Sequence, residues 1–236
     1  FNRLRGRIDP EGRDRLLLML ALGTIPAAVL GFFLKDFFES MFQAYAAVGV
    51  GSGDADCDVY LHSPSAGATS GFAAALAASE RAAGGLDGVL ANGHTVGAQT
   101  YDVGVVNYAD AGDYVVGHLA GAAVTYYGNT TITGTLAANE MLKIWDVYVG
   151  PAYVGGLTVT LQMGEAGPSL MLSSYDPGTT VGSLESPSAS AVTSGSGRAY
   201  LNFPVASAGH LGLVLMRDIA WGAEARSFTL CITPYL

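Results

Sequence analysis

Apolar residues follow two different patterns along the chain. From Leu16 to Leu34 they form one uncharged run, LLLMLALGTIPAAVLGFFL, which Lys35 and Asp36 close. From residue 44 onward, short apolar runs alternate with polar positions and are separated by Gly, Asp, Asn and Pro. The first pattern predicts a helix that is apolar on all sides, and the second predicts short sandwich strands. We therefore expect a mainly β fold with a long N-terminal helix: a kinked apolar α-helix followed by two β-sandwich units.

The uncharged run has the length of a membrane span. Its 19 residues reach roughly 28 Å at about 1.5 Å per residue, close to the thickness of a bilayer core. Five arginines precede it, which predicts a cytoplasmic N-terminus and an external remainder. A buried helix of a soluble protein is the alternative. Pro26, which follows Gly23 and Thr24, predicts a kink near residues 22–26.

Aromatic residues extend this predicted helix beyond the uncharged run. A helix that is apolar all round must be buried, so we expect contact with the membrane before assembly and helix–helix packing in a homo-oligomer afterwards. The residues expected in these assembly contacts are Leu17, Leu18, Leu20, Ile25, Pro26, Leu30, Phe33, Phe37, Phe38 and Phe42.

Ten segments after residue 44 alternate in the manner of strands. An Ala-rich stretch, residues 71–85, instead predicts a short helix that begins after Ser70 and ends at Gly84 and Gly85. The expected strands are Tyr45–Val50, Asp56–His62, Thr100–Val106, Asp113–Leu119, Thr131–Leu136, Leu157–Met163, Ser169–Ser174, Ala199–Phe203, Leu211–Met216 and Ser227–Thr233.

An internal repeat divides this β region. The segment DADCDVYLHSP (54–64) matches GPSLMLSSYDP (167–177) in outline, and AGDYVVGHL (111–119) matches AGHLGLVLM (208–216). We therefore expect three parts: a basic tail with an apolar assembly or membrane helix (1–43), a first β-sandwich unit (44–133) and a second (134–236).

The matched segments resemble bacterial pre-peptidase C-terminal domains, extracellular β-sandwiches with a D-x-D-x-Y-L strand and a later A-G-x-Y strand. The second unit keeps Ala208 and Gly209 but has Leu211 and Ser169 where the family pattern has Tyr and Asp. The resemblance implies an extracellular sandwich with a binding or spacer role. In the first unit it rests on Asp56, Asp58, Tyr60, Leu61, Ala111, Gly112 and Tyr114.

The N-terminal part carries two further resemblances. Residues 13–42 resemble a membrane helix of the undecaprenyl-diphosphatase family, without that family's catalytic loop. The plan of an apolar helix ahead of a β head is similar to type IV pilins and archaeal flagellins. Pilins, however, have Glu at the fifth position, where this chain has Arg5, and their apolar run starts earlier. This likeness of plan implies a filament with helices in its core.

Four groups of residues are candidates for chemistry. Asp54, Asp56 and Asp58 would share one face of a strand and either bind Ca²⁺ or form a solvated face. Cys57 and Cys231 either form a disulfide between the units or remain two thiols. Asn129 begins an N-x-T glycosylation sequence. The four histidines lack the spacing of a metal pair.

Composition narrows the functional classes. The net charge of −9 disfavours binding of nucleic acid. The chain shows no catalytic motif, so we expect a protein without catalytic residues or a cofactor. The favoured hypothesis is a structural subunit of an extracellular, pilus-like filament, with surface or glycan ligands as further partners. The alternatives are a membrane-anchored surface binding or spacer protein, and an accessory domain of a secreted hydrolase.

Overall fold

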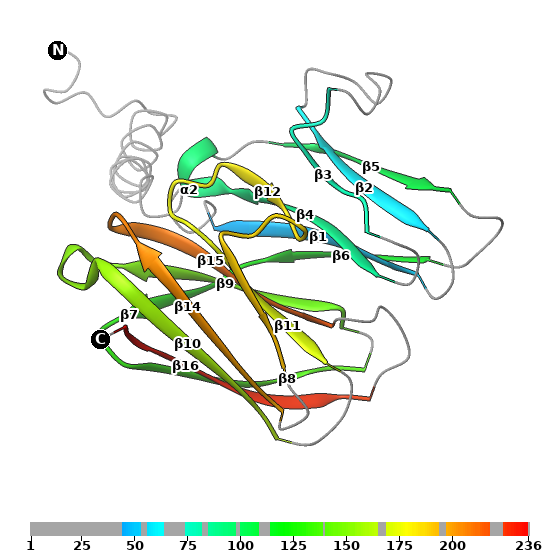
Figure 1. Ribbon diagram of the computed structural model, residues 1–236. Helices are drawn as coiled ribbons and strands as arrows, with labels where there is room; N and C mark the ends of the chain where they lie inside the picture. Colours follow the sequence, from blue (N-terminus) through cyan, green and yellow to red (C-terminus); the bar gives the residue numbers. More distant parts are fainter. Residues whose placement is uncertain are drawn as a thin grey trace, which may run out of the picture. The chain divides into compact units, whose positions relative to one another are not determined.

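The computed structural model is almost entirely β-sheet, with 67% of its described residues in strands and 5% in helices (Figure 1). All of these residues belong to one compact unit, Gln43–Leu236. None of the described helices is long and apolar enough to cross a membrane. The structure describes residues 44–52, 56–63, 74–81, 85–97, 100–108, 114–138, 140–164, 169–193, 197–217 and 224–235.

The expected fold class, mainly β with a long N-terminal helix, is therefore wrong on the helix. The longest helices described are α2 (Gly93–Val96) and the 3₁₀ turn η3 (Pro151–Tyr153). The predicted segment 1–43, with all ten expected assembly residues, lies outside the described residues. The fold that the structure shows is built by the period-two segments, whose alternate side chains enter the cores between sheets.

The first half of the described chain forms two small sheets. Sheet A has the order β12-β4-β1-β6, and sheet B has the order β3-β2-β5. Their strands are β1 (Tyr45–Ser52), β2 (Cys57–His62), β3 (Ala77–Ser79), β4 (Leu86–Asn92), β5 (Asp102–Asn107), β6 (Tyr114–Ala120) and, from further along the chain, β12 (Val181–Ser183).

The second half forms two larger sheets. Sheet C has the order β13-β11-β15-β9-β7 and sheet D the order β14-β10-β16-β8, with β7 parallel to β9. Their strands are β7 (Ala122–Tyr126), β8 (Thr130–Leu136), β9 (Leu142–Val149), β10 (Gly155–Met163), β11 (Leu170–Tyr175), β13 (Ala189–Val192), β14 (Arg198–Val205), β15 (Gly209–Arg217) and β16 (Arg226–Pro234).

The internal repeat is a repeat of strand pairing. In the first repeat, β1 to β6, strand β1 pairs with β4 and β6 while β2 pairs with β3 and β5. In the second repeat, formed by β10, β11 and β13 to β16, β10 pairs with β14 and β16 while β11 pairs with β13 and β15. Strand β6 thus corresponds to β16, so the predicted match of 111–119 (β6) with 208–216 (β15) is wrong by one strand.

The strands between the two repeats, β7 to β9, belong to the sheets of the second repeat. Strand β8 pairs with β16, β9 pairs with β15, and β7 pairs with β9. The predicted boundary at residue 133 falls inside β8. In the opposite direction, β12 of the second half pairs with β4 of the first.

Three hydrophobic cores join the sheets into a stack in the order D, C, A, B (Figure 1). The first core lies between sheets D and C, around Trp145 and Phe228. The second lies between sheets C and A, around Tyr45 and Leu142. The third lies between sheets A and B, around Val59. Because sheet A is covered on both faces, every residue of β4 is buried.

All ten predicted strands are confirmed, each within two or three residues at its ends. The predicted helix at 71–85 is wrong, because Ala77–Ser79 forms β3 and pairs with Val59–Leu61 of β2. Alanine favours a helix in isolation, but here the pairing with a buried strand determines the local structure.

Candidate functional site

Two histidines and one aspartate meet where sheet A packs against sheet C. His94 lies in α2, directly after β4, and Asp146 and His210 lie on β9 and β15. The pairing of Tyr148 with His210, and of Asp146 with Gly212, puts both sheet C residues on the face toward sheet A. We call these three residues the His–Asp–His cluster; it joins the first repeat to the second.

The cluster is compact and largely buried. His94 Nε2 lies 2.6 Å from Asp146 Oδ2, and His210 Nδ1 lies 2.9 Å from Asp146 Oδ1. The two imidazole rings stack with their centroids 3.5 Å apart. The side chains are 16% (His94), 5% (Asp146) and 31% (His210) exposed, so solvent reaches the cluster mainly from the His210 side.

Neighbouring side chains hold the cluster in place. The Asn92 side chain accepts a hydrogen bond from the His94 backbone N–H at 3.0 Å and donates one to the Tyr45 hydroxyl at 3.0 Å. That hydroxyl donates to the Asp176 carbonyl at 3.0 Å. Burial, and secondly the negative charge of Asp146, raise the pKa of Tyr45 above its usual range, so its hydroxyl remains a donor.

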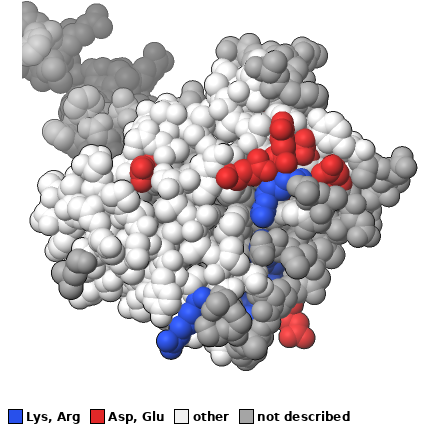
Figure 2. Space-filling model, in the orientation of Figure 1, with Lys and Arg blue, Asp and Glu red and all other residues white. Residues whose placement is uncertain are grey.

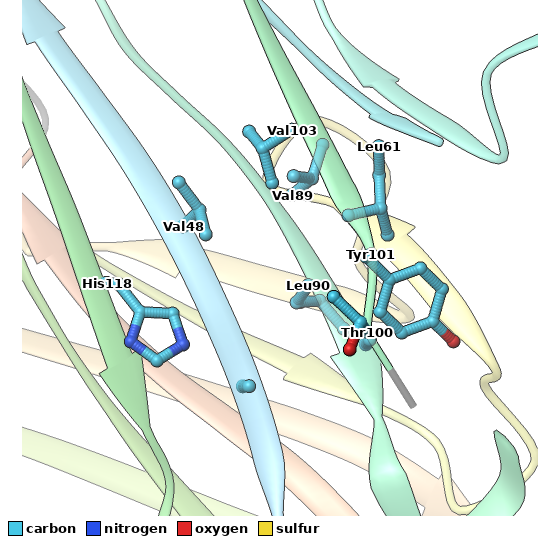
Figure 3. Close-up of a pocket in the computed structure, with 10 residues that line it drawn as sticks. Val48, Leu61, Val89, Leu90, Thr100, Tyr101, Val103 and His118 are labelled. Atoms are coloured by element: carbon cyan, nitrogen blue, oxygen red, sulfur yellow. The ribbon is translucent and has the colours of Figure 1, made fainter. Parts of the chain in front are cut away.

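A pocket of about 360 Å³ opens between sheets A and B (Figure 3). Apolar side chains such as Val48, Leu61 and Val89 line it. Its polar side chains are those of Thr100, Tyr101 and His118. His118 lies on β6 and Val103, a further lining residue, lies on β5. Both strands are sheet edges among the described residues.

Those two edges distinguish the first repeat from the second. In the second repeat the corresponding strands β16 and β15 are covered by β8 and β9. These covering strands supply Leu136, Trp145, Val147 and Val149 to the core between sheets D and C. Among the described residues no strand does the same for β6 and β5. The apolar pocket therefore lies where the first repeat, as far as the structure describes it, lacks the pair of covering strands that the second repeat has.

The predicted Asp54–Asp56–Asp58 group is only partly visible. Asp54 lies outside the described residues, while Asp58 is buried on β2 and accepts a hydrogen bond from Tyr60 at 3.1 Å. Burial, then the charges of Glu80, Asp56 and Glu185, raise the pKa of Asp58. Figure 2 shows acidic side chains gathered at one place on a mostly uncharged face. Binding of Ca²⁺ by Asp54, Asp56 and Asp58 stays a prediction.

The two remaining predicted sites are the disulfide between the units and the glycosylation sequence. No disulfide joins Cys57, which is buried on β2, to Cys231, which is half-buried on β16. The Cys231 thiol instead lies 3.8 Å from the Thr131 hydroxyl. Asn129 is exposed in the turn between β7 and β8, and its glycosylation stays a prediction.

Sequence reasoning missed the His–Asp–His cluster. The sequence separates His94 from Asp146 by 52 residues, and Asp146 from His210 by 64. No spacing rule covers such distances, because the packing of sheet A on sheet C brings the residues together. The local signal was Asn92-Gly93 before His94, a turn sequence that ends a strand.

No protein-family model matches the chain, and no curated protein matches its sequence. Several solved structures are similar in fold. The pre-peptidase C-terminal domain of a Bacillus anthracis collagenase is 14% identical, with 48% of this chain and 96% of that chain covered at a TM-score of 0.38. The pili of Bacillus endospore appendages, which are described as disulfide-linked, are 17% identical over 44% of this chain and 81% of theirs, at 0.27.

A third similar structure is a family 6 carbohydrate-binding module from Clostridium cellulolyticum. It is 16% identical, with 40% of this chain and 71% of that chain covered at a TM-score of 0.22. The packed sheets D and C form a β-sandwich, which is the coarse part of the predicted resemblance to pre-peptidase C-terminal domains. The helix of pilin type is not shown.

Proposed function

We propose that the protein is a non-catalytic structural protein of the cell exterior that assembles with other copies by adding a β-strand at β6. The observation that carries this proposal is the incomplete first repeat. Strands β5 and β6 are uncovered edges among the described residues, whereas their counterparts β15 and β16 are covered. Assembly through strands replaces the helix packing that the sequence had suggested.

Strand β6 has the properties of an edge that accepts another strand. It is seven residues long, YVVGHLA, without proline or a Lys, Arg, Asp or Glu. Val115 and Val116 are 38% and 49% exposed. Proteins normally protect such an edge with charge, proline or short length. Strand β14, an edge of sheet D, shows that protection, because it carries Arg198 and Pro204.

The occupant that fits this edge is β6 of a second copy. Two uncharged edges that pair antiparallel satisfy each other's backbone N–H and C=O groups. The same pairing covers the exposed valines and closes one side of the pocket between sheets A and B. A continuous sheet across two copies would follow from it.

The test is the mass of the full chain in solution, measured by light scattering over a range of concentrations. We expect assembled wild-type protein and a monomeric Val115→Lys/Val116→Lys variant, because like charges would face each other across the edge. The control is Val154→Lys, which changes a residue 41% exposed outside any strand and should remain assembled. A monomeric wild type, or a double variant as large as the wild type, would refute the proposal.

A second candidate function is binding of uncharged glycans by the outer face of sheet D. Within the described residues, the outward positions of its four strands carry one charged side chain, Arg198. Most of the other outward positions carry hydroxyl or amide groups, and Thr158 donates a hydrogen bond to the Asn202 side-chain oxygen at 2.8 Å. The aromatic ring of Tyr200 is exposed on the same face. The remaining outward polar residues are Thr131, Thr133, Thr135, Thr160, Gln162, Ser227, Thr229 and Thr233.

Hydroxyl groups and an exposed aromatic ring suit the polar groups and flat apolar face of a sugar. Retardation in gels that contain a neutral polysaccharide tests this candidate. Tyr200→Ala should abolish the retardation, whereas Tyr127→Ala, at an exposed turn, should not. Glycan binding at this face would be rejected if the polysaccharide retards neither variant, or if it retards both variants equally.

A further inference from the structure

In the His–Asp–His cluster, each oxygen of the buried Asp146 carboxylate is contacted by one imidazole nitrogen. Asp146 is buried, and a buried carboxylate needs a compensating positive charge or several donors. Among the described residues its ion-pair partners are His94 and His210, and neither Lys nor Arg.

We propose that His94, Asp146 and His210 bind one divalent transition-metal ion, with Zn²⁺ as the representative ion. Two imidazole nitrogens and one carboxylate oxygen are a donor set that such ions prefer, whereas Ca²⁺ and Mg²⁺ require oxygen donors. The donor atoms lie within 4.8 Å of one another. This site is separate from the assembly edge at β6 and from the acidic group around Asp58.

The distances suit a metal ion after small shifts. In a tetrahedral Zn²⁺ site with bonds of about 2.0–2.1 Å, neighbouring ligand atoms lie about 3.3 Å apart. The two nitrogen-to-oxygen separations here are 2.6 and 2.9 Å. Each ligand atom therefore needs to move by less than about 1 Å to admit the ion. The two stacked rings must also tilt apart, because each nitrogen lone pair lies in the plane of its ring. The fourth position then faces the more exposed His210 side, where a water molecule can complete the coordination.

Neighbouring groups restrict the positions of His94 and His210. The backbone of His94 is fixed by the side chain of Asn92, and the ring of His210 lies 5.0 Å from that of Tyr148. Tyr45 connects the end of β4 to the residue after β11, because its hydroxyl accepts a hydrogen bond from Asn92 and donates one to the Asp176 carbonyl. Such partners hold ligand side chains before the ion arrives.

The location gives the ion a structural role. His94 follows β4 of sheet A, while Asp146 and His210 belong to sheet C. An ion bound to all three residues would fasten the first repeat to the second. The sequence had offered a Cys57–Cys231 disulfide for that purpose, and the structure does not contain it.

The test is a titration of the full chain with Zn²⁺ after treatment with a chelator, followed by calorimetry, and with Co²⁺, followed by visible absorption. We expect one equivalent to bind, with the absorption of a four-coordinate Co²⁺ site containing nitrogen ligands. The variants His94→Ala, His210→Ala and Asp146→Asn should each lose at least about tenfold in affinity. His118→Ala, at an exposed histidine in the pocket, is the matched control and should bind normally.

A variant that unfolds would not decide the question, so His210→Gln provides a second approach. His210 is partly exposed, and glutamine removes the nitrogen ligand without opening a cavity. Zn²⁺ should raise the melting temperature of the wild type but not that of His210→Gln. The proposal is overturned if the wild type binds no tighter than about 1 mM. It is also overturned if the cluster variants bind as the wild type does, or if Asp56→Asn alone removes the ion.

Discussion

Asp87 offers a sharp test of the electrostatics between sheets A and B. Its side chain is buried on β4 and accepts hydrogen bonds from the Ser79 hydroxyl and the Arg81 backbone N–H, both at 2.8 Å. Burial is the main cause that raises the pKa of Asp87 from 3.8 to about 6, and the charges of Glu185 and Asp58 add to it. Replacement of Asp87 by Asn removes the charge and keeps an acceptor oxygen.

The sign of the effect follows from proton binding. Between pH 3.8 and about 6 the folded chain holds a proton on Asp87 that the unfolded chain has released. The free energy of unfolding therefore falls as the pH rises through this window, and it stays at the lower value above it. At about 1.4 kcal/mol per pKa unit, the full loss is at most about 3 kcal/mol.

The assay is urea unfolding followed by tryptophan fluorescence at about pH 4 and about pH 8. We expect Asp87→Asn to match the wild type at the lower pH. At the higher pH it should be more stable by about 1–3 kcal/mol, because the amide carries no charge to bury. Asp102→Asn, at the half-buried first residue of β5, is the control for the exchange of Asp for Asn itself. The argument from proton binding fails if the stability difference between Asp87→Asn and the wild type is the same at both pH values, or if the variant is the less stable protein at pH 8.

Three further substitutions test the packing between sheets, each by urea unfolding. Tyr45→Phe should cost about 1–3 kcal/mol, because Asn92 loses its acceptor and the Asp176 carbonyl loses its donor; an unchanged midpoint would show that the hydroxyl does not matter. Gly88→Ala should cost about 1–3 kcal/mol, since its new Cβ would lie 2.5 Å from Leu184 Cδ1 and 2.8 Å from a backbone oxygen; a neutral result would mean that the sheets separate easily. Phe228→Ala should cost about 3–5 kcal/mol through the cavity it opens in the core between sheets D and C, and a loss below 1 kcal/mol would count against a closely packed core.

Alternation of polar and apolar residues predicted the strands that are covered on one face. Strand β14, for example, alternates exposed and buried residues along its whole length. Strands β4 and β9 are buried on both faces, do not alternate, and were missed. Strands β11 and β15 are buried in the same way but were predicted from their apolar runs between turn residues. Strand β3 was taken for a helix because its alanines favour one until β2 pairs with them.

The candidate sites divide in a similar way. The Asp56–Asp58 pair was visible from the sequence because neighbouring alternate residues on a strand share a face. The His–Asp–His cluster was not, since its members come from two repeats and three elements. The open edges at β5 and β6 were also invisible, because they follow from which strands pair, and the repeat in sequence does not state the pairing.

The alternation along the chain is enough to predict a duplicated set of strands, because a period of two is a property of neighbouring residues. The stacking of the sheets, the edges left uncovered among the described residues, and the carboxylate shared by two histidines become known from the folded structure alone. Those features depend on contacts between residues far apart in the chain, and such contacts arise when the apolar faces of separate sheets are buried against one another.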